Sequence, residues 1–170
     1  MVEERREQGP SAGTGSAAYP EVSDEVLESW QYIVNEVAGR LNVPVGQIMR
    51  RRGPELAVCV TNDDARNPHA VGEAAALEGS GLYCEAVLRE GVPLLVPNAV
   101  ADPSWDGNPS LARHGLASYL GYPIRWPDGT LFGTLCVLDD REKAYTRQDR
   151  DVMGLMRDLI ESNLRTLCGR

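Results

Sequence analysis

The sequence predicts an α+β domain with an antiparallel sheet at its centre and long helices at its two ends. Two apolar runs in residues 118–139 flank Pro127, Asp128 and Gly129, and an Asp-Gly pair tolerates the positive φ angles of a tight hairpin turn. The runs VGQIMRRR and LAVCVTN, on either side of a Gly-Pro-Glu turn, indicate a second, shorter hairpin. Neither run of the longer hairpin alternates between polar and apolar residues, so we expect both of its faces to be covered.

The composition favours one domain and excludes several classes of partner. The chain has 170 residues, of which 42% are hydrophobic, so it can bury a sizeable core. Its net charge of -8 argues against a nucleic-acid surface, which needs clustered Lys and Arg. There is no apolar run long enough for a membrane span, and the N-terminus is charged where a signal peptide would be apolar. We expect a cytoplasmic protein that binds neither nucleic acid nor membrane.

The cysteines and the one basic run have ordinary structural explanations. Cys59, Cys84, Cys136 and Cys168 are widely spaced and form neither a CxxC pair nor a Cys/His cluster with metal-ligand spacing. We expect reduced thiols that act as small core residues, and no metal site. The basic run of residues 50–52 is short and ends at a Gly-Pro turn, so we interpret it as a solvated strand end.

The first quarter of the chain divides into a tail and a helix. Residues 1–20 combine charge with Gly, Ser and Ala and have no apolar period, which predicts a disordered tail. The domain is expected to span residues 21–168. Ser23 is a candidate N-cap, and the apolar residues that follow recur at the spacing of an amphipathic helix. They are Val26, Trp30, Ile33, Val34, Val37 and Leu41.

Between the two hairpins the sequence is polar and rich in turn residues. Three alanines and a leucine at residues 74–77 indicate a helical turn. Residues 82–88 predict a short helix that Gly91 stops, and residues 94–97 predict a brief edge strand because prolines fit an edge better than a centre.

Residues 98–115 form a long connection dense in Asp, Pro, Gly and Asn. A connection of this length inside a compact domain is usually functional or disordered. It carries Trp105 and His114, which a disordered linker rarely needs. We therefore interpret it as a lid or a pocket wall.

The last helix carries more apolar surface than one sheet face needs. Thr146 and Asp149 predict a capping box at its start, and Gly169 a C-cap at its end. Its apolar residues form two neighbouring stripes, Val152, Leu155 and Leu159 on one, and Met153, Met156, Ile160, Leu164 and Leu167 on the other. Two interpretations stay open: a helical interface with another subunit or domain, or one wide buried face.

This order of elements resembles a GAF domain, the small-molecule sensory module of signalling proteins. The resemblance covers about residues 22–168 and is carried by short motifs. They are YCEAV at 83–87, PLLV at 93–96, Asn98-Ala99, Ala101-Asp102-Pro103, Trp105, SYLGYPI at 118–124, Gly129, GTLCVLD at 133–139 and the capping box. The resemblance implies a sheet of five or six antiparallel strands, with the terminal helices on one face and a ligand pocket on the other. GAF domains of this kind precede histidine kinase, PAS or cyclase modules.

Strand parity then assigns residues to the implied pocket, since successive side chains point to opposite faces. On the first strand, if Leu120, Tyr122 and Ile124 face the terminal helices, then the pocket face carries Tyr119, Gly121 and Pro123. On the partner strand, the pocket face carries Thr134, Cys136 and Leu138, and the helix face carries Leu135 and Val137. The candidate ligand-binding residues are Tyr83, Cys84, Trp105, Leu111, His114, Tyr119, Gly121, Thr134 and Cys136.

Each of the chemically distinctive candidates also has a structural explanation. The two thiols fit small buried side chains, the Tyr119 hydroxyl fits a bond to a loop carbonyl, and His114 fits a donor that fixes its loop. Trp105 fits an anchor for that loop as well as it fits ligand stacking.

The sequence does not name a cofactor. GAF domains that attach bilins do so through a Cys-His pair, which this chain lacks. Haem needs an axial ligand deep in the pocket, whereas His69 and His114 lie in loop-like sequence. The Asn-Lys-Phe-Asp-Glu motif of cyclic-nucleotide-binding GAF domains is absent.

Three functional hypotheses follow. The first is a non-catalytic sensory domain that binds a small molecule and acts through terminal helices at a homodimer interface, coupled to a kinase, PAS or cyclase module. The second is a thiol-dependent enzyme similar to free methionine-R-sulfoxide reductase, and the third is a dimerisation module with a vestigial pocket. The residues assigned to the dimer and output helices are Trp30, Ile33, Val37, Met153, Met156, Ile160, Leu164 and Leu167.

Overall fold

The structure is a computed structural model that describes residues 19–169. The disorder predicted for residues 1–20 falls, up to residue 18, outside the described residues. Tyr19 differs from that prediction, because its ring stacks on Trp126 with centroids 4.2 Å apart and its hydroxyl donates a hydrogen bond to Asp128. Packing against the turn of the longer hairpin therefore starts at Tyr19.

A six-stranded sheet forms the centre of the molecule, which confirms the predicted α+β fold. Its strands are β1 (Val45–Arg52), β2 (Glu55–Thr61), β3 (Ala74–Ala76), β4 (Leu94–Val96), β5 (Ser118–Arg125) and β6 (Leu131–Asp139). Their order is β3-β2-β1-β6-β5-β4, and every neighbouring pair is antiparallel. Both predicted hairpins are present, and β1 and β6 lie at the centre.

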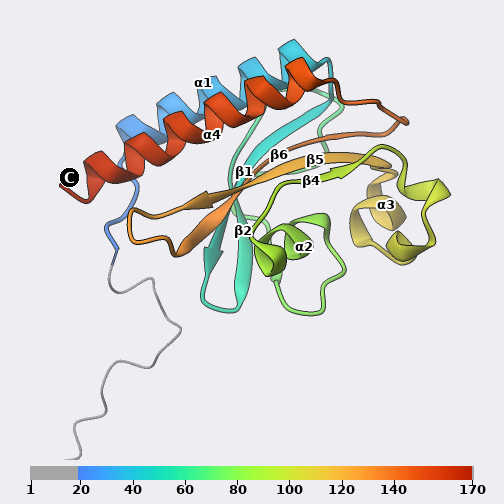
Figure 1. The fold of residues 1–170 in the computed structure, drawn as a ribbon, viewed down its shortest axis with the longest axis horizontal. Coiled ribbons are helices and arrows are strands. Elements are labelled where there is room, and N and C mark those ends of the chain that lie inside the picture. Colours follow the sequence, from blue (N-terminus) through green and yellow to red (C-terminus); the bar gives the residue numbers. More distant parts are fainter. Residues whose placement is uncertain (1–18, 170) are drawn as a thin grey trace, which may run out of the picture.

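The helices lie on both faces of the sheet. Figure 1 shows α1 (Asp24–Leu41) and α4 (Arg147–Leu167) side by side across one face, while α2 (Tyr83–Glu90) and α3 (Pro109–His114) lie on the opposite side. The predicted capping box is present: the Thr146 hydroxyl accepts from the Asp149 N–H, and the Asp149 carboxylate accepts from the Thr146 N–H. The sheet thus separates the terminal helices from the smaller ones.

Each face of the sheet has its own apolar core, divided as strand parity predicts. Leu120 and Ile124 of β5 pack with the terminal helices, and half-buried Tyr122 packs on the same core. Tyr119 belongs to the core on the opposite face. On β6, Leu135 and Val137 face the terminal helices, and Cys136 and Leu138 face the other way.

The alanine run is a strand and not the helical turn that its composition indicates. Ala74, Ala75 and Ala76 pair with Ala57, Leu56 and Glu55 of β2 and form an edge of the sheet. Helix propensity favours alanine by less than about 1 kcal/mol per residue over most residues. Three residues cannot hold a helix, so the unpaired backbone of β2 decides their structure.

Arg50 differs from the predicted solvated strand end. Only 5% of its surface is exposed, and its guanidinium lies over the Phe132 ring, 5.3 Å from the centroid. Its Nη1 also donates to the Glu21 carboxylate at 3.4 Å. The charge is therefore covered by an aromatic face and paired with the segment that precedes α1.

The terminal helices bury most of the residues assigned to an interface. Six of them are in the core of a single chain and have no surface to offer another: Trp30, Ile33, Val37, Met153, Ile160 and Leu164. Met156 and Leu167 are half-buried against the same core. The exposed apolar residues of these helices are instead Tyr32 (67%), Leu155 (68%) and Leu159 (48%). The wide buried face thus accounts for one stripe, and the other stays partly exposed.

Residues 19–169 contain neither a membrane-spanning helix nor a metal-binding cluster. No helix there combines the length and the apolar surface that crossing a bilayer would need. No group of three or more His, Cys, Asp or Glu side chains in the same residues has an arrangement that could hold a metal ion.

Candidate ligand-binding site

A cavity of about 150 Å³ opens on the face of the sheet opposite the terminal helices. Its walls come from β1, β2, β5, β6, α2, α3 and the segment around β3. Apolar lining is provided by Met49, Leu56, Val58, Leu82 and Leu138. Polar lining is provided by Gln47, His69, Glu73, Ser110, Arg113 and His114. An apolar cavity of this volume holds a molecule about the size of benzene, and a few convergent polar groups can orient it.

Four of the nine predicted pocket residues line this cavity: Tyr83, Cys84, His114 and Tyr119. Thr134 and Cys136 are completely buried beneath Cys84, and Gly121 lies against the Tyr119 ring. Trp105 and Leu111 pack at the edge of the same core and are not among the lining residues. The cavity therefore lies nearer to β1 and β2 than the sequence predicts.

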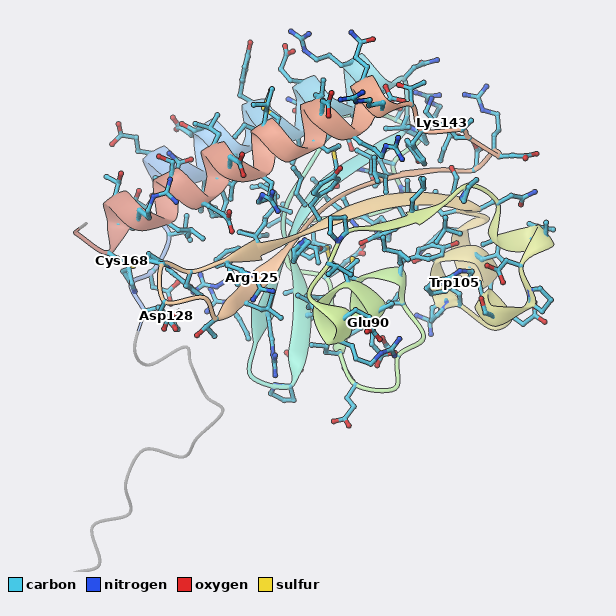
Figure 2. The ribbon with its side chains drawn as sticks, viewed as in Figure 1. Glu90, Trp105, Arg125, Asp128, Lys143 and Cys168 are labelled. Atoms are coloured by element: carbon cyan, nitrogen blue, oxygen red, sulfur yellow. The ribbon has the colours of Figure 1, made fainter. Side chains whose placement is uncertain are left out.

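Three aromatic rings in a row support one wall. The rings of Tyr119 and Tyr83 stack with centroids 4.8 Å apart, and the Tyr83 hydroxyl donates to the Leu116 carbonyl at 2.8 Å. Trp105 packs against Tyr83 at 5.0 Å, on the side of the sheet away from the terminal helices (Figure 2). Burial raises the pKa of Tyr83 to about 12 and that of Tyr119 well above its usual range, so both phenols are neutral at neutral pH. This contact ties the connection that carries Trp105 to helix α2.

A histidine pair forms the polar end of the cavity. Nδ1 of His69 lies 3.2 Å from the Glu73 carboxylate and can donate to it. Nε2 of His69 is buried and has no hydrogen-bond partner. The His114 ring packs edge to face against His69, with centroids 5.1 Å apart. Although His114 is an exposed residue, partial desolvation lowers its pKa, and the neighbouring His69 and Arg113 lower the pKa further.

A hydrogen-bonded thiol lies at the opposite end. Sγ of Cys84 is 3.2 Å from the Tyr119 hydroxyl, 3.3 Å from the Thr134 hydroxyl and 3.9 Å from Sγ of Cys136. These bonds lower the pKa of Cys84, the Cys136 contact contributing most, although burial opposes them. The contact with Cys84, and then burial, raise the pKa of Cys136.

The family model for the GAF domain matches residues 25–164, which include all six strands and most of both terminal helices. The chain belongs to the GAF family. GAF domains are in general sensory or regulatory domains, and this membership agrees with the sheet and the arrangement of helices described above. No curated protein matches the sequence.

Solved GAF structures share this fold at low sequence identity. A GAF domain of a phosphoenolpyruvate-protein phosphotransferase from Coxiella burnetii has a TM-score of 0.70 and 14% identity, with 87% of each chain covered. A phycocyanobilin-bound GAF domain of a cyanobacterial phytochrome has a TM-score of 0.70 and 12% identity, with 84% of this chain and 85% of that chain covered. The type II free methionine-R-sulfoxide reductase from Thermoplasma acidophilum has a TM-score of 0.67 and 11% identity, with 85% of this chain and 95% of that chain covered. Identities this low show the fold alone.

The polar residues of this GAF domain's cavity are largely ones that sequence reasoning missed. His69 and Glu73 lie in the connection between β2 and β3, Arg113 is in α3, and Gln47 is in β1. The i, i+4 spacing of His69 and Glu73 is the one local signal in the sequence. Such a spacing predicts contact between side chains in a helix, but this connection has no regular structure. The sequence predicts only that Gln47 lies in a hairpin strand, and nothing in that strand marks it as a polar residue that lines a cavity.

Proposed function

We propose that this GAF domain is a non-catalytic sensory module that binds a small molecule in the cavity between the sheet, α2 and α3. The observation that carries the proposal is the unpartnered Nε2 of His69, a residue that lines a cavity with both apolar and polar walls. A buried acceptor without a partner costs about 1–3 kcal/mol. A ligand that supplies the missing hydrogen bond recovers that free energy on binding.

The lining defines the chemistry of the ligand. In the neutral tautomer in which Nδ1 donates to Glu73, Nε2 of His69 accepts, and the matching ligand group is a hydroxyl or an N–H. Arg113 offers a positive charge beside it, which suits a carboxylate or another anionic group. The apolar residues of β1, β2 and β6 suit a compact hydrocarbon body. We therefore expect a small hydroxy or amino compound with one anionic group.

The terminal helices are the proposed output. They pack directly on the strands whose other faces line the cavity: a Cβ at Gly46 of β1 would be 2.9 Å from the Val34 carbonyl of α1. On α4, the Glu161 carboxylate accepts from the Arg125 N–H at the end of β5. A ligand shifts the packing of these helices only by its difference in affinity for two arrangements.

We further propose a homodimer formed through the exposed apolar residues of the terminal helices, Tyr32, Leu155 and Leu159. An exposed apolar stripe on a helix is typical of a surface that another helix covers. The output partner of such a dimer would be a kinase, PAS or cyclase module. All four cysteines are free thiols, which suits a reducing cytoplasm.

Native mass spectrometry of the full chain, purified from its natural host, tests the proposal. We expect a stoichiometric small molecule that is released on denaturation, identified by its mass and returned chemically unchanged. Ala75→Trp should abolish binding, because exposed Ala75 lies at the rim and lines the cavity. Ala76→Trp is the matched control, because Ala76 is exposed on the same strand and does not line it.

Three results would contradict the proposal. A chain that carries no compound from its host would favour a dimerisation module with a vestigial pocket. Conversion of a bound sulfoxide to a sulfide would favour the reductase. Equal binding by the Ala75→Trp and Ala76→Trp variants would place the ligand elsewhere.

A further inference from the structure

Two buried hydroxyl groups and a second thiol surround the sulfur of Cys84. The hydroxyls of Tyr119 and Thr134 can each donate to this sulfur, at distances of 3.2 and 3.3 Å, and Sγ of Cys136 lies 3.9 Å from it. A thiol is a weak acceptor, whereas a thiolate accepts several strong bonds. Both hydroxyl residues are completely buried, so water does not compete with them. The cluster is therefore arranged for a negative sulfur.

The position of Cys84 at the start of a helix also favours a negatively charged sulfur. It is the second residue of the eight-residue helix α2, whose Leu82 N-cap makes no side-chain capping bond. The first-turn N–H groups of a helix and its dipole favour a nearby negative charge. The hydrogen bonds of the cluster also lower the pKa of Cys84 despite its burial.

Access to the two thiols is unequal. Cys84 lines the cavity and is 7% exposed, whereas Cys136 is 0% exposed and does not line it. A reagent as small as hydrogen peroxide that enters the cavity meets the Cys84 sulfur, and Cys136 lies directly behind it. This order of exposure is the one that a reactive thiol and a resolving thiol require.

We propose that Cys84 is a peroxide-reactive thiol that is oxidised through the cavity and then forms a disulfide with Cys136. In the first step the Cys84 thiolate attacks one oxygen of hydrogen peroxide. The O–O bond breaks to give a sulfenic acid at Cys84 and a hydroxide, which takes up a proton to become water. In the second step the Cys136 sulfur attacks the Cys84 sulfur. The S–O bond breaks, and the hydroxide that leaves takes the Cys136 proton as a second water.

The two steps balance, because two thiols lose two electrons to one peroxide. The disulfide requires the sulfurs to approach from 3.9 Å to about 2.05 Å. Since β6 is held between β1 and β5, α2 is the element that moves. Oxidation would also take the Cys84 sulfur away from Tyr119 and Thr134, and so change the wall of the cavity.

Peptide mapping of the full chain tests this. The reduced protein is treated with hydrogen peroxide, alkylated with N-ethylmaleimide and digested without reductant. We expect a peptide linked through Cys84 and Cys136, with Cys59 and Cys168 alkylated. Cys168, at the end of α4 and far from α2 (Figure 2), and half-buried Cys59 are internal controls. The Cys59→Ser, Cys168→Ser double variant should give the same linked peptide.

Single variants separate the two steps. Cys136→Ser should stop the reaction at a sulfenic acid on Cys84, which dimedone traps, and Cys84→Ser should leave Cys136 reduced. Tyr119→Phe and Thr134→Val should each slow oxidation of Cys84 by about tenfold, because each removes a hydrogen bond to a charged group. Thermal melts of the reduced variants identify any that do not fold.

The outcomes that overturn the proposal are equally specific. It fails if Cys84 stays reduced while Cys59 or Cys168 is oxidised in the wild-type chain. It also fails if the Cys84 sulfenic acid accumulates in the wild-type chain without linking to Cys136. This test reads the oxidation state of Cys84 and Cys136, whereas the test of the proposed sensory function reads a bound compound, so failure of one is distinguishable from failure of the other.

Discussion

Tyr119 and Gly121 show how much single residues of β5 decide. Parity along the strand is enough to predict that Tyr119 points away from the terminal helices, because a strand has only two faces. It does not predict that the ring lies along the strand over Gly121, where a Cβ would overlap the phenol. The glycine makes room for Tyr119 to reach the Cys84 sulfur.

Gly121→Ala is therefore expected to displace the Tyr119 ring and destabilise the protein by about 1–3 kcal/mol, the usual range for an overfilled core. Chemical denaturation measures this change. Gly154→Ala is the matched control: its Cβ would meet only Tyr122, at 4.0 Å, and in helix α4 alanine should stabilise by about 0.5–1 kcal/mol. Equal effects of the two substitutions would contradict this account of Gly121.

His114 makes stability depend on pH. Partial desolvation, then His69 and Arg113, lower its pKa below the ordinary value of 6.5, and Glu73 opposes them only in part; because His114 is exposed, we expect a small effect. The unfolded chain therefore takes up a proton at this residue before the folded chain does. Stability should be fully present above about pH 6.5 and decrease as the pH falls towards the lowered pKa.

The expected measurement is a larger decrease in Tm between pH 7.5 and pH 5.5 for the wild-type chain than for His114→Asn. Arg113→Gln should reduce the decrease as well, because it removes one of the positive neighbours. A pH profile that is unchanged in His114→Asn would show that the titration of another group causes the decrease.

Among the secondary-structure elements, the sequence predicted the hairpin turns and helix starts, because a few adjacent residues determine each of them. The turns at Gly53 and Gly129 predicted both hairpins, because a positive φ is a property of a few residues. Ser23 and Thr146 predicted two helix starts for a similar reason. Elements that depend on a distant partner were predicted less well.

The cavity belongs to this second group. β3 exists because β2 offers an unpaired edge, and His69 reaches His114 only because the connection after β2 folds back towards α3. No spacing in the sequence encodes that approach. Accordingly, four of the predicted pocket residues line the cavity, while its polar end was assigned almost entirely by the structure.

The capping box gives a prediction at this scale. Thr146→Ala removes the acceptor of the Asp149 N–H and should lower the free energy of unfolding by about 1 kcal/mol. Urea denaturation measures the effect. Thr166→Ala is the control, because Thr166 lies in the last turn of the same helix and its hydroxyl donates only to the Ser162 carbonyl. A larger loss from Thr166→Ala would mean that the start of α4 does not limit its stability.

For the whole molecule, the exposed stripe on the terminal helices determines the expected assembly. Replacing Leu155 and Leu159 together by Glu should convert the proposed dimer to a monomer, because two charges cannot be buried unpaired. Light scattering after size exclusion measures the mass. Val100→Glu is the control, since Val100 is 70% exposed in the connection after β4, away from these helices. A wild-type chain that stays monomeric at high concentration would refute the dimer.

The order of the strands also has a consequence for synthesis. β1 pairs with β6, so Val45 meets Leu138 although most of the domain lies between them in the chain. Such non-local pairing raises contact order and slows folding, because a long loop must close before the central pair forms. On the ribosome, the hairpin of β1 and β2 emerges early with an open edge. Until residues 131–139 follow, that edge is a template on which two nascent chains can pair.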